Sequence, residues 1–437
     1  MQTSFTLTQL LDPQVKESEK ILRACVHCGF CTATCPTYVL LGDELDSPRG
    51  RIYLIKEMLE NDRRASRDVV KHIDRCLSCL ACMTTCPSGV HYMHLVDHAR
   101  EHIELTYQRP PADRALRALL ARVLTDAGLF RLAVVAGKLA RPLAPVLKVL
   151  GLSRLAAMVR LTPRGKLSPP ADRAGTVYPA QGERRGRVAL LAGCINPVLG
   201  PSTNEAAIRL LNRNGIEVVI APGEGCCGSL VHHMGREEQA LAQARNNIDA
   251  WTREIDGEGL DAILVTVSGC GTTVKDYGFM LRGDEAYAEK AGRISALAKD
   301  ITEYLAALDL PRAPAPAVLT VAYHAACSLQ HGQRVTDEPK DLLCKFGFIV
   351  EDIAEGHLCC GSAGTYNILQ PALADRLRAR KVANIERLEP DVIAAGNIGC
   401  IMQIAAGTDI PVVHTVELID WASGGPVPEP LRQRSQL

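Results

Sequence analysis

The pattern of apolar and polar residues divides the chain into a helical first part and a second part in which helices alternate with strands. Ser47 and Pro48 suit a helix start, because a serine side chain can cap free amides and proline fits the first turn. Apolar residues then recur at helical spacing at Ile52, Ile55, Met58 and Leu59. A second helix is predicted to begin at Ser66 and to continue through Ile73. The first hundred residues are therefore expected to form a helical domain.

A basic helical segment follows from Asp113 to Lys166. It has eleven Lys and Arg residues against two Asp residues, a local charge of +9. Its first apolar stripe consists of Leu116, Leu119, Leu120, Val123 and Leu124. Two interpretations stay open: an element that meets a membrane or a partner, or helices that pack on their own domain and turn a basic face to water. The second is the ordinary arrangement in soluble domains. Residues 163–187, rich in Pro, Gly and charge, are expected to be a linker.

The second half repeats one order of elements. Each copy opens on a buried strand that ends at a cysteine, RVALLAGC in the first and LTVAYHAAC in the second. A helix and a second strand follow, at 203–214 and 216–221 in the first copy and at 337–346 and 348–353 in the second. Later each copy has a third strand that leads to another cysteine, DAILVTVSGC and DVIAAGNIGC. Strands that alternate with helices are typical of parallel sheets.

The predicted fold is therefore multidomain, α and α/β: an N-terminal helical ferredoxin-type domain, then two repeated α/β domains with parallel sheets. The expected boundaries are 1–110 for the helical domain, 111–186 for the basic segment and linker, 187–312 and 313–425 for the two α/β domains, and 426–437 for a tail.

Composition and the N-terminal sequence limit the classes of function that we expect for the chain. Lys and Arg number 49, and so do Asp and Glu, so the whole-chain charge gives no reason to expect nucleic acid as a partner. The N-terminal MQTSFTLTQLLDPQVKE lacks the features of an export signal, so the 17 cysteines are expected to stay reduced in the cytoplasm. No apolar run reaches the ~18 residues that a spanning helix needs.

Two cysteine runs near the amino end share the form C-x2-C-x2-C-x3-C-P, CVHCGFCTATCP and CLSCLACMTTCP. Two separate zinc knuckles or a disulfide framework are the alternatives, but two such runs are typical of paired [4Fe–4S] clusters. In that arrangement the fourth cysteine of each run binds the other cluster. The predicted ligands are Cys25, Cys28, Cys31 and Cys86 for one cluster, and Cys76, Cys79, Cys82 and Cys35 for the other.

The α/β repeat carries eight further cysteines: Cys194, Cys226, Cys227 and Cys270 in the first copy, and Cys327, Cys359, Cys360 and Cys400 in the second. The lone cysteine precedes the Cys-Cys-Gly triplet by 32 positions in both copies. Because these cysteines follow predicted strands, each copy is expected to gather four thiols from three loops at the sheet edge. Such a site could hold an iron–sulfur cluster, bind zinc or cycle between dithiol and disulfide. Adjacent cysteines favour the cluster, because they can contact different irons.

Three other features of the second half receive structural interpretations. The histidines near these cysteines (His232, His233, His324, His331 and His357) are expected to be hydrogen-bonded core or surface residues. Cys344, left over on a predicted helix, is expected to be a small core residue. The stretch 223–228 matches the dinucleotide pattern G-x-G-x-x-G, but the second copy preserves only Cys-Cys-Gly there, so the nucleotide interpretation is weak.

The chain resembles the iron–sulfur subunit of bacterial glycolate oxidase (glycolate dehydrogenase) over nearly its whole length. The resemblance is closest in RACVHCGFCTATCPTYVLLGDELDSPRGRIYLIKEML, RCLSCLACMTTCPSGVHY, ALAQARNNIDAW, SGCGTTVKDYG and HLCCGSAGTY. The Cys-Cys-Gly domains are shared with heterodisulfide reductase, lactate-utilisation proteins and anaerobic glycerol-3-phosphate dehydrogenase. Such relatives end each copy on C-x2-C, whereas this chain has Thr273 and Gln403 at the last position. Each site is thus left with four cysteines.

The resemblance implies an electron-transfer role without substrate chemistry on this chain. An FAD-containing subunit would oxidise glycolate to glyoxylate, or D-lactate to pyruvate, beside a second flavoprotein-like subunit. Electrons would then pass to the quinone pool on the cytoplasmic face of the inner membrane. The alternatives are the iron–sulfur subunit of a lactate or glycerol-3-phosphate dehydrogenase, or a catalytic subunit like that of heterodisulfide reductase.

Overall fold

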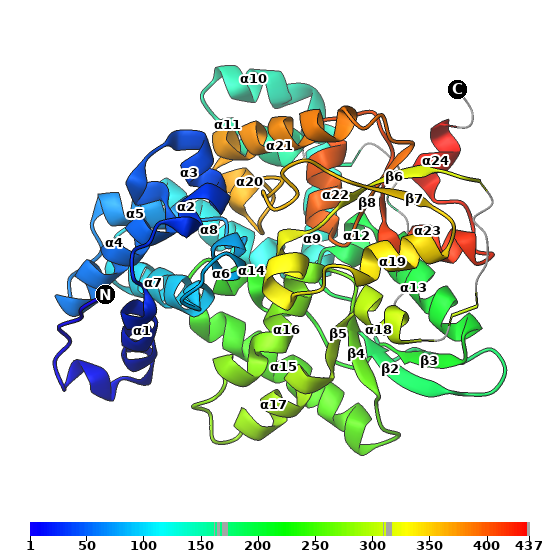
Figure 1. The fold of residues 1–437 in the computed structure, drawn as a ribbon, viewed down its shortest axis with the longest axis horizontal. Coiled ribbons are helices and arrows are strands. Elements are labelled where there is room, and N and C mark those ends of the chain that lie inside the picture. Colours follow the sequence, from blue (N-terminus) through cyan, green and yellow to red (C-terminus); the bar gives the residue numbers. More distant parts are fainter. Residues whose placement is uncertain (161, 164–166, 168–173, 309, 312–316, 435–437) are drawn as a thin grey trace.

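The computed structural model describes the chain except residues 161, 164–166, 168–173, 309, 312–316 and 435–437. Figure 1 shows a helical domain on one side of the molecule and two α/β units on the other, the first unit in green and the second in yellow to red. The described residues contain no helix that is both long and apolar enough to cross a bilayer.

The N-terminal domain is helical, as predicted. Its helices are α1 (Pro13–Ala24), α2 (Phe30–Thr34), α3 (Pro36–Leu41), α4 (Pro48–Glu60), α5 (Arg67–Asp74), α6 (Ala81–Thr84) and α7 (Tyr92–Thr106). Both predicted helix starts are confirmed: the Ser47 side chain accepts a hydrogen bond from the Gly50 amide, and the Ser66 side chain accepts one from the Val69 amide. The apolar faces of α4 and α5 pack on α7 in one core, which holds the two cysteine runs in place.

The basic segment forms α8 (Pro111–Val123), α9 (Ala127–Ala140), α10 (Ala144–Val149) and α11 (Ser153–Arg160). These helices pack inward, since Leu120 contacts Ile368 and Leu369 of the second α/β unit. The buried Arg117 also forms ion pairs with Asp74 of α5 and with Asp113. The segment nevertheless leaves large apolar side chains exposed on α9 and α10 and around them: Leu132, Val135, Leu139, Leu143, Val146, Val149 and Leu150. It combines internal packing with an apolar outer surface.

The first α/β unit is built on β1 (Val177–Tyr178), β2 (Gly186–Leu190), β3 (Ile216–Val219), β4 (Ala262–Val265) and β5 (Ala298–Asp300), in the order β1-β3-β2-β4-β5. All pairs are parallel except β1 with β3. Part of the expected linker thus supplies an edge strand. The unit's helices are α12 (Asn196–Leu199), α13 (Pro201–Arg213), α14 (Ser229–His232), α15 (Glu237–Asp256), α16 (Ser268–Met280), α17 (Ala288–Leu297) and α18 (Ile301–Ala307).

The second unit repeats this plan with β6 (Thr320–His324), β7 (Ile349–Asp352), β8 (Val392–Ala395) and β9 (Val412–His414), all parallel, in the order β7-β6-β8-β9. A π-helical turn, η4 (Ser328–Gln333), follows the first strand. The helices are α19 (Glu338–Lys345), α20 (Tyr366–Leu369), α21 (Pro371–Glu386), α22 (Ile398–Ala405), α23 (Thr415–Ala422) and α24 (Glu429–Arg434). The predicted fold class is confirmed.

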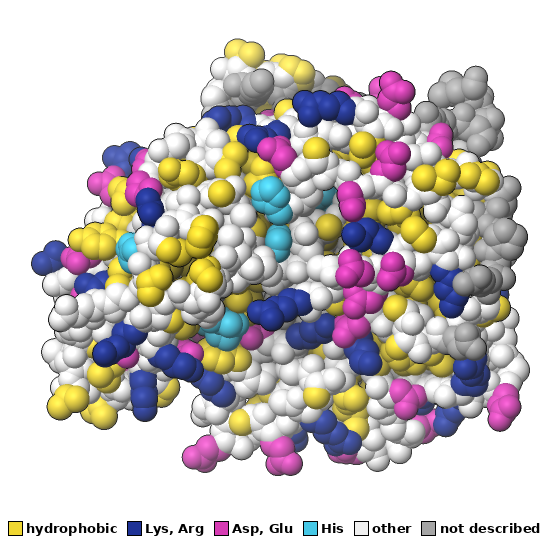
Figure 2. Space-filling model, viewed as in Figure 1, with side chains coloured by type: hydrophobic (Ala, Val, Ile, Leu, Met, Phe, Trp, Pro, Cys, Tyr) yellow, Lys and Arg dark blue, Asp and Glu magenta, His cyan; other side chains and the backbone are white. Residues whose placement is uncertain are grey.

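The two sheets share one core. Val188 and Leu190 of the first sheet belong to the same apolar cluster as Val321 and Tyr323 of the second. Helix α13 packs on α23 and α18 packs on α19, so these helices lie between the sheets. The expectation that Cys344 is a core residue is wrong: it lies on the outer face of α19 and is exposed, next to the buried Leu343. On the molecular face shown in Figure 2, acidic and basic side chains are interspersed.

Candidate metal centres

The structure brings thiols from both ferredoxin-type runs together in one place. Cys25, Cys28 and Cys31 of the first run line a small cavity together with Cys86 of the second. Cys82 of the second run also lines this cavity. Burial raises the pKa of the Cys31 thiol to about 11, so a nearby cation is needed to keep it as a thiolate at neutral pH.

A second group of thiols forms around the second run. Burial raises the pKa of the Cys82 thiol, and the neighbouring Cys79, Cys76 and Cys35 raise it further. Cys35 therefore lies among the thiols of the run to which it does not belong. Four soft donors that interact in a buried site are the donor set of an iron–sulfur cluster.

The backbone of both runs turns in the same unusual way. His27 and Gly29 in the first run, and Ser78 and Leu80 in the second, have positive φ angles between 49° and 87°. This region is rare for residues with a side chain, and it persists where the surroundings demand it, often at functional sites. Each run thus wraps its first three cysteines around one point.

Two buried side chains donate hydrogen bonds to these thiols. Arg51, which is 1% exposed, donates to the Cys35 Sγ at 3.7 Å, and its charge is balanced by the buried Asp46 at 3.3 Å. The Tyr92 hydroxyl donates to the Cys76 Sγ at 3.8 Å. Such donors stabilise negative charge on cluster sulfurs and raise the reduction potential. The donor set, the burial and these hydrogen bonds fit [4Fe–4S] clusters.

In the first α/β unit the cysteines lie at the carboxyl ends of adjacent strands. Cys194 follows β2, Cys226 and Cys227 follow β3, and Cys270 is in the first turn of α16 after β4. Cys226 interacts directly with Cys194 and Cys227, and hydrogen bonds from these two thiols hold its pKa well below the ordinary value. Cys227 also interacts with Cys270. Four thiols from three loops therefore meet in one site.

The second unit repeats this arrangement. Cys327 interacts with Cys359, and Cys360 interacts with both Cys359 and Cys400. All four side chains are buried. The thiols again come from the carboxyl ends of three adjacent strands.

Backbone geometry and close packing explain the glycine of each Cys-Cys-Gly triplet. Gly228 and Gly361 have φ angles of +88° and +92°, which favour glycine. A Cβ atom would also lie 3.0 Å from the Ala240 carbonyl at Gly228, and 2.6 Å from the Ala374 carbonyl at Gly361. The missing side chain lets the cysteine loop pack directly on the following helix, α15 or α21.

A large cavity of about 670 Å³ connects these sites. It is lined by Cys194, Cys226, Cys227 and Cys270 of the first unit, by Cys327, Cys359 and Cys400 of the second, and by Cys79 of the ferredoxin-type domain. Apolar side chains of α8, α9 and α11 form another of its walls. The middle helices therefore enclose a space onto which three groups of cysteines open.

Comparison with known proteins gives consistent matches. Residues 21–90 match the family described as 4Fe-4S dicluster domain, and residues 188–275 and 321–405 match the cysteine-rich domain family. The Escherichia coli glycolate oxidase iron-sulfur subunit is 43% identical over 97% of this chain and 99% of its own length. The chain belongs to the glycolate oxidase iron–sulfur subunit family.

More distant relatives follow the same pattern. A probable glycolate oxidase iron-sulfur subunit from Bacillus subtilis is 30% identical over 92% of this chain and 94% of its own length. Lactate utilization protein A from Bacillus licheniformis is 25% identical over 54% of this chain and 99% of its own length. A crystal structure of a hypothetical protein from Helicobacter pylori shares the fold, with a TM-score of 0.55 and 9% identity over 97% of this chain and 75% of that one.

Thr273 and Gln403 stand where the C-x2-C pattern of relatives has its last cysteine, and both have structural roles in this chain. The Thr273 hydroxyl donates a hydrogen bond to the Gly269 carbonyl at 3.4 Å, within its own helix. The Gln403 amide, 1% exposed, donates to the Ala374 carbonyl at 3.2 Å. Their side chains hold helices in place.

The loop that matches the dinucleotide pattern, residues 223–228, forms hydrogen bonds within the protein. The Glu224 carboxylate accepts hydrogen bonds from the Ala192 amide and the Trp251 ring, and the Gly225 amide donates to Asn247. A phosphate cradle needs such amides free to face the ligand.

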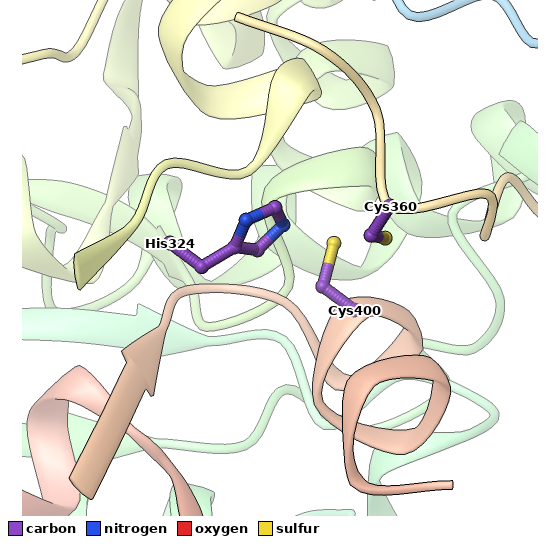
Figure 3. Close-up of side chains that lie close together, drawn as sticks. All are labelled: His324, Cys360 and Cys400. Atoms are coloured by element: carbon purple, nitrogen blue, oxygen red, sulfur yellow. The ribbon is translucent and has the colours of Figure 1, made fainter. Parts of the chain in front are cut away.

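Three of the five neighbouring histidines make side-chain hydrogen bonds, as expected. His232 and His233 both contact the buried Asp97 of α7, and His331 contacts Thr84 of α6. His324 departs from the expectation: it is 1% exposed, and neither ring nitrogen has a hydrogen-bond partner in the described structure. One of its nitrogens and the Sγ atoms of Cys360 and Cys400 lie within 4.8 Å of one another (Figure 3).

The sequence pattern favoured a structural role for His324, although the repeat contained a signal for a different one. His324 lies three residues before Cys327, and the residue three positions before Cys194 in the first copy is Leu191. A histidine that replaces a core leucine in a buried strand needs a polar partner. Burial, and then the charge of Lys381, lower the pKa of His324 to about 3, so its ring is neutral.

Proposed function

We propose that the chain is the iron–sulfur electron-transfer subunit of a multi-subunit glycolate (2-hydroxy acid) dehydrogenase. It would receive electrons from an FAD-containing subunit that oxidises glycolate to glyoxylate, or D-lactate to pyruvate, beside a second flavoprotein-like subunit. The observation that carries the proposal is the contiguous series of thiols: the cavity lined by both cysteine-rich sites is also lined by Cys79 of the ferredoxin-type domain.

The proposed ligands are Cys25, Cys28, Cys31 and Cys86 for one [4Fe–4S] cluster, and Cys76, Cys79, Cys82 and Cys35 for the other. Bound clusters supply one-electron transfer. The protein's own groups hold the thiolates in a dry environment, and Arg51 and Tyr92 donate hydrogen bonds to two of the sulfurs. The cysteines of the two repeats are candidate sites for further metal.

We also propose that the electron acceptor is quinone and that the chain lies against the cytoplasmic face of the inner membrane. Support comes from the exposed apolar side chains of α9 and α10, such as Leu132, Leu139 and Val149, within a segment of positive charge. An apolar surface that carries Lys and Arg suits a bilayer with anionic lipids.

A lactate dehydrogenase role is the second candidate, favoured by the match to lactate utilization protein A, which covers 54% of this chain. The two roles differ in the flavin subunit, so the substrate that reduces the assembled complex distinguishes them.

The test is iron and acid-labile sulfide analysis of anaerobically purified full-length chain, followed by reduction with glycolate and the flavin subunit under EPR. We expect about eight irons from the ferredoxin-type domain alone, and reduced-cluster signals only when glycolate and the flavin subunit are both present. Cys31→Ser should lose iron, whereas Cys344→Ser, at an exposed thiol, is the matched control. Colourless protein would reject the proposal. Turnover by the isolated chain with an artificial donor would instead indicate a catalytic reductase.

A further inference from the structure

The two cysteine-rich sites differ around the same four thiols. In the second unit, strand β6 ends on His324, whose imidazole is directed toward the thiols in Figure 3. In the first unit the equivalent residue is Leu191, which is 3% exposed and has no donor atom. The second site therefore has a possible ligand that the first lacks.

The environment of His324 leaves few roles open to it. A buried polar group is normally hydrogen-bonded, because an unpaired one loses its interaction with water. Both ring nitrogens of His324 are without a hydrogen-bond partner in the described structure, and the ring is 1% exposed. A metal ion is the partner that would use a neutral ring nitrogen next to thiolates.

The donor geometry suits a single ion. His324 and Cys327 are three residues apart, which is the short spacing of zinc-binding pairs. A ring nitrogen of His324 and the thiols of Cys360 and Cys400 lie within 4.8 Å of one another. Bonds of about 2.0–2.3 Å to a tetrahedral ion place the donor atoms about 3.3–3.8 Å apart, so a small adjustment closes the site. Cys327 lies close enough to Cys360 and Cys400 to influence both.

From these contacts we propose that His324, Cys327, Cys360 and Cys400 bind one zinc ion, so that the second cysteine-rich unit carries a three-cysteine, one-histidine site. The all-cysteine site of the first unit remains a separate centre. This inference goes beyond the electron-transfer role and does not depend on it.

The charge around the second site fits this ligand set. Three thiolates and one neutral imidazole around Zn²⁺ leave a charge of −1. Lys381 is 2% exposed, and its ammonium donates to the Glu355 carbonyl at 2.9 Å, with the charges of Cys360, Cys327 and Cys359 nearby. In a buried environment this ammonium would balance the zinc–thiolate centre.

The first unit lacks that charge as well. Gly228 packs on Ala240 and Gly361 packs on Ala374, which aligns α15 with α21 and places Asn247 where the second unit has Lys381. Asn247 is neutral, and its amide donates to the Cys226 carbonyl at 3.0 Å. The ligand and the balancing charge are thus both confined to the second unit.

The experiment measures zinc and iron in the same samples of full-length chain, purified anaerobically with a tag that does not contain histidine. We expect about one zinc per chain in the wild type. His324→Leu copies the first unit and should lose the zinc while iron in the ferredoxin-type domain is unchanged. His357→Leu is the matched control, since this exposed histidine is next to the same cysteine loop and should keep the zinc.

Two further variants separate ligand loss from misfolding. His324→Cys offers a thiolate in place of the imidazole and should keep zinc, whereas His324→Asn is polar and similar in size but should lose it. After cobalt substitution, the visible absorption of His324→Cys should shift from that of the wild type because a ligand has changed. Wild-type chain without zinc, or full zinc retention in both His324→Leu and His324→Asn, would overturn the proposal. Wild-type chain that binds zinc but no iron would instead count against the electron-transfer role.

Discussion

Removing the Tyr92 hydroxyl, which lies beside the second group of ferredoxin-type thiols, should lower the reduction potential of the cluster that those thiols bind. The Tyr92 side chain is 3% exposed, and its hydroxyl donates to the Cys76 Sγ at 3.8 Å. Tyr92→Phe removes this hydrogen bond and keeps the ring in its packed position. A reduced cluster carries one more negative charge than an oxidised one, so the hydrogen bond stabilises the reduced form more.

The size of the effect follows from hydrogen-bond energies. If reduction strengthens the bond by about 0.5–1.5 kcal/mol, its loss lowers the potential by about 20–60 mV, since 59 mV corresponds to about 1.4 kcal/mol for one electron. Only the couple of the cluster bound by Cys76 should shift, because Tyr92 contacts that thiol.

The assay is a redox titration of the anaerobic protein followed by EPR, with the wild type measured in parallel. Tyr53→Phe is the control, because Tyr53 lies on α4 and is 50% exposed. An unchanged or raised potential in Tyr92→Phe, or an equal shift of both couples, would refute the assignment of this hydrogen bond to one cluster.

Three other changes have defined outcomes. Gly361→Ala places a Cβ 2.6 Å from the Ala374 carbonyl at a φ of +92°, so it should destabilise the chain by about 2–4 kcal/mol in thermal unfolding; Gly364→Ala, with a φ of +55° and open space, should cost only about 1 kcal/mol. Burial raises the pKa of Glu101 from 4.5 to about 7. Ionisation of this carboxyl therefore destabilises the folded chain as the pH rises from about 4.5 through 7. Glu101→Gln should therefore raise the melting temperature at pH 8 and change it little below pH 4.5, with a gain of the order of 1 kcal/mol after solvent screening; an equal gain at both pH values would contradict this. Leu139→Glu, at a side chain that is 80% exposed, should weaken co-sedimentation with anionic vesicles without loss of iron, and unchanged binding would count against the membrane contact.

Much of the architecture could be predicted from short-range patterns. The strands before Cys194 and Cys327 are recognisable as buried strands because each contains an apolar run, Val188 to Leu190 and Val321 to Tyr323, as a parallel strand covered on both faces requires. The position of the cysteines at strand ends then determined that thiols from three loops would meet. Fold class and the gathering of thiols were therefore accessible without coordinates.

Other features depended on contacts that a sequence pattern does not contain. Strand β1 has only two residues, Val177 and Tyr178, in a segment rich in Pro and Gly, and it exists because β3 offers a free edge. Cys344 is on the same helix as the buried Leu342 and Leu343, but it is rotated away from the core. In both cases the tertiary neighbour, rather than the local composition, decided the outcome.

The asymmetry between the two repeats is linked to their position. Leu77 and Cys79 of the ferredoxin-type domain pack in one cluster with Cys327 and Cys359, so the second site is the one that adjoins the second group of ferredoxin-type thiols. A centre at that point affects electron transfer through its charge, because the interaction between nearby charges is stronger in a low dielectric than in water. A zinc ion does not change its oxidation state. If His324 and Lys381 fix one zinc–thiolate centre of constant charge there, the second unit sets the electrostatic environment of the neighbouring cluster and leaves further electron transfer to the first unit.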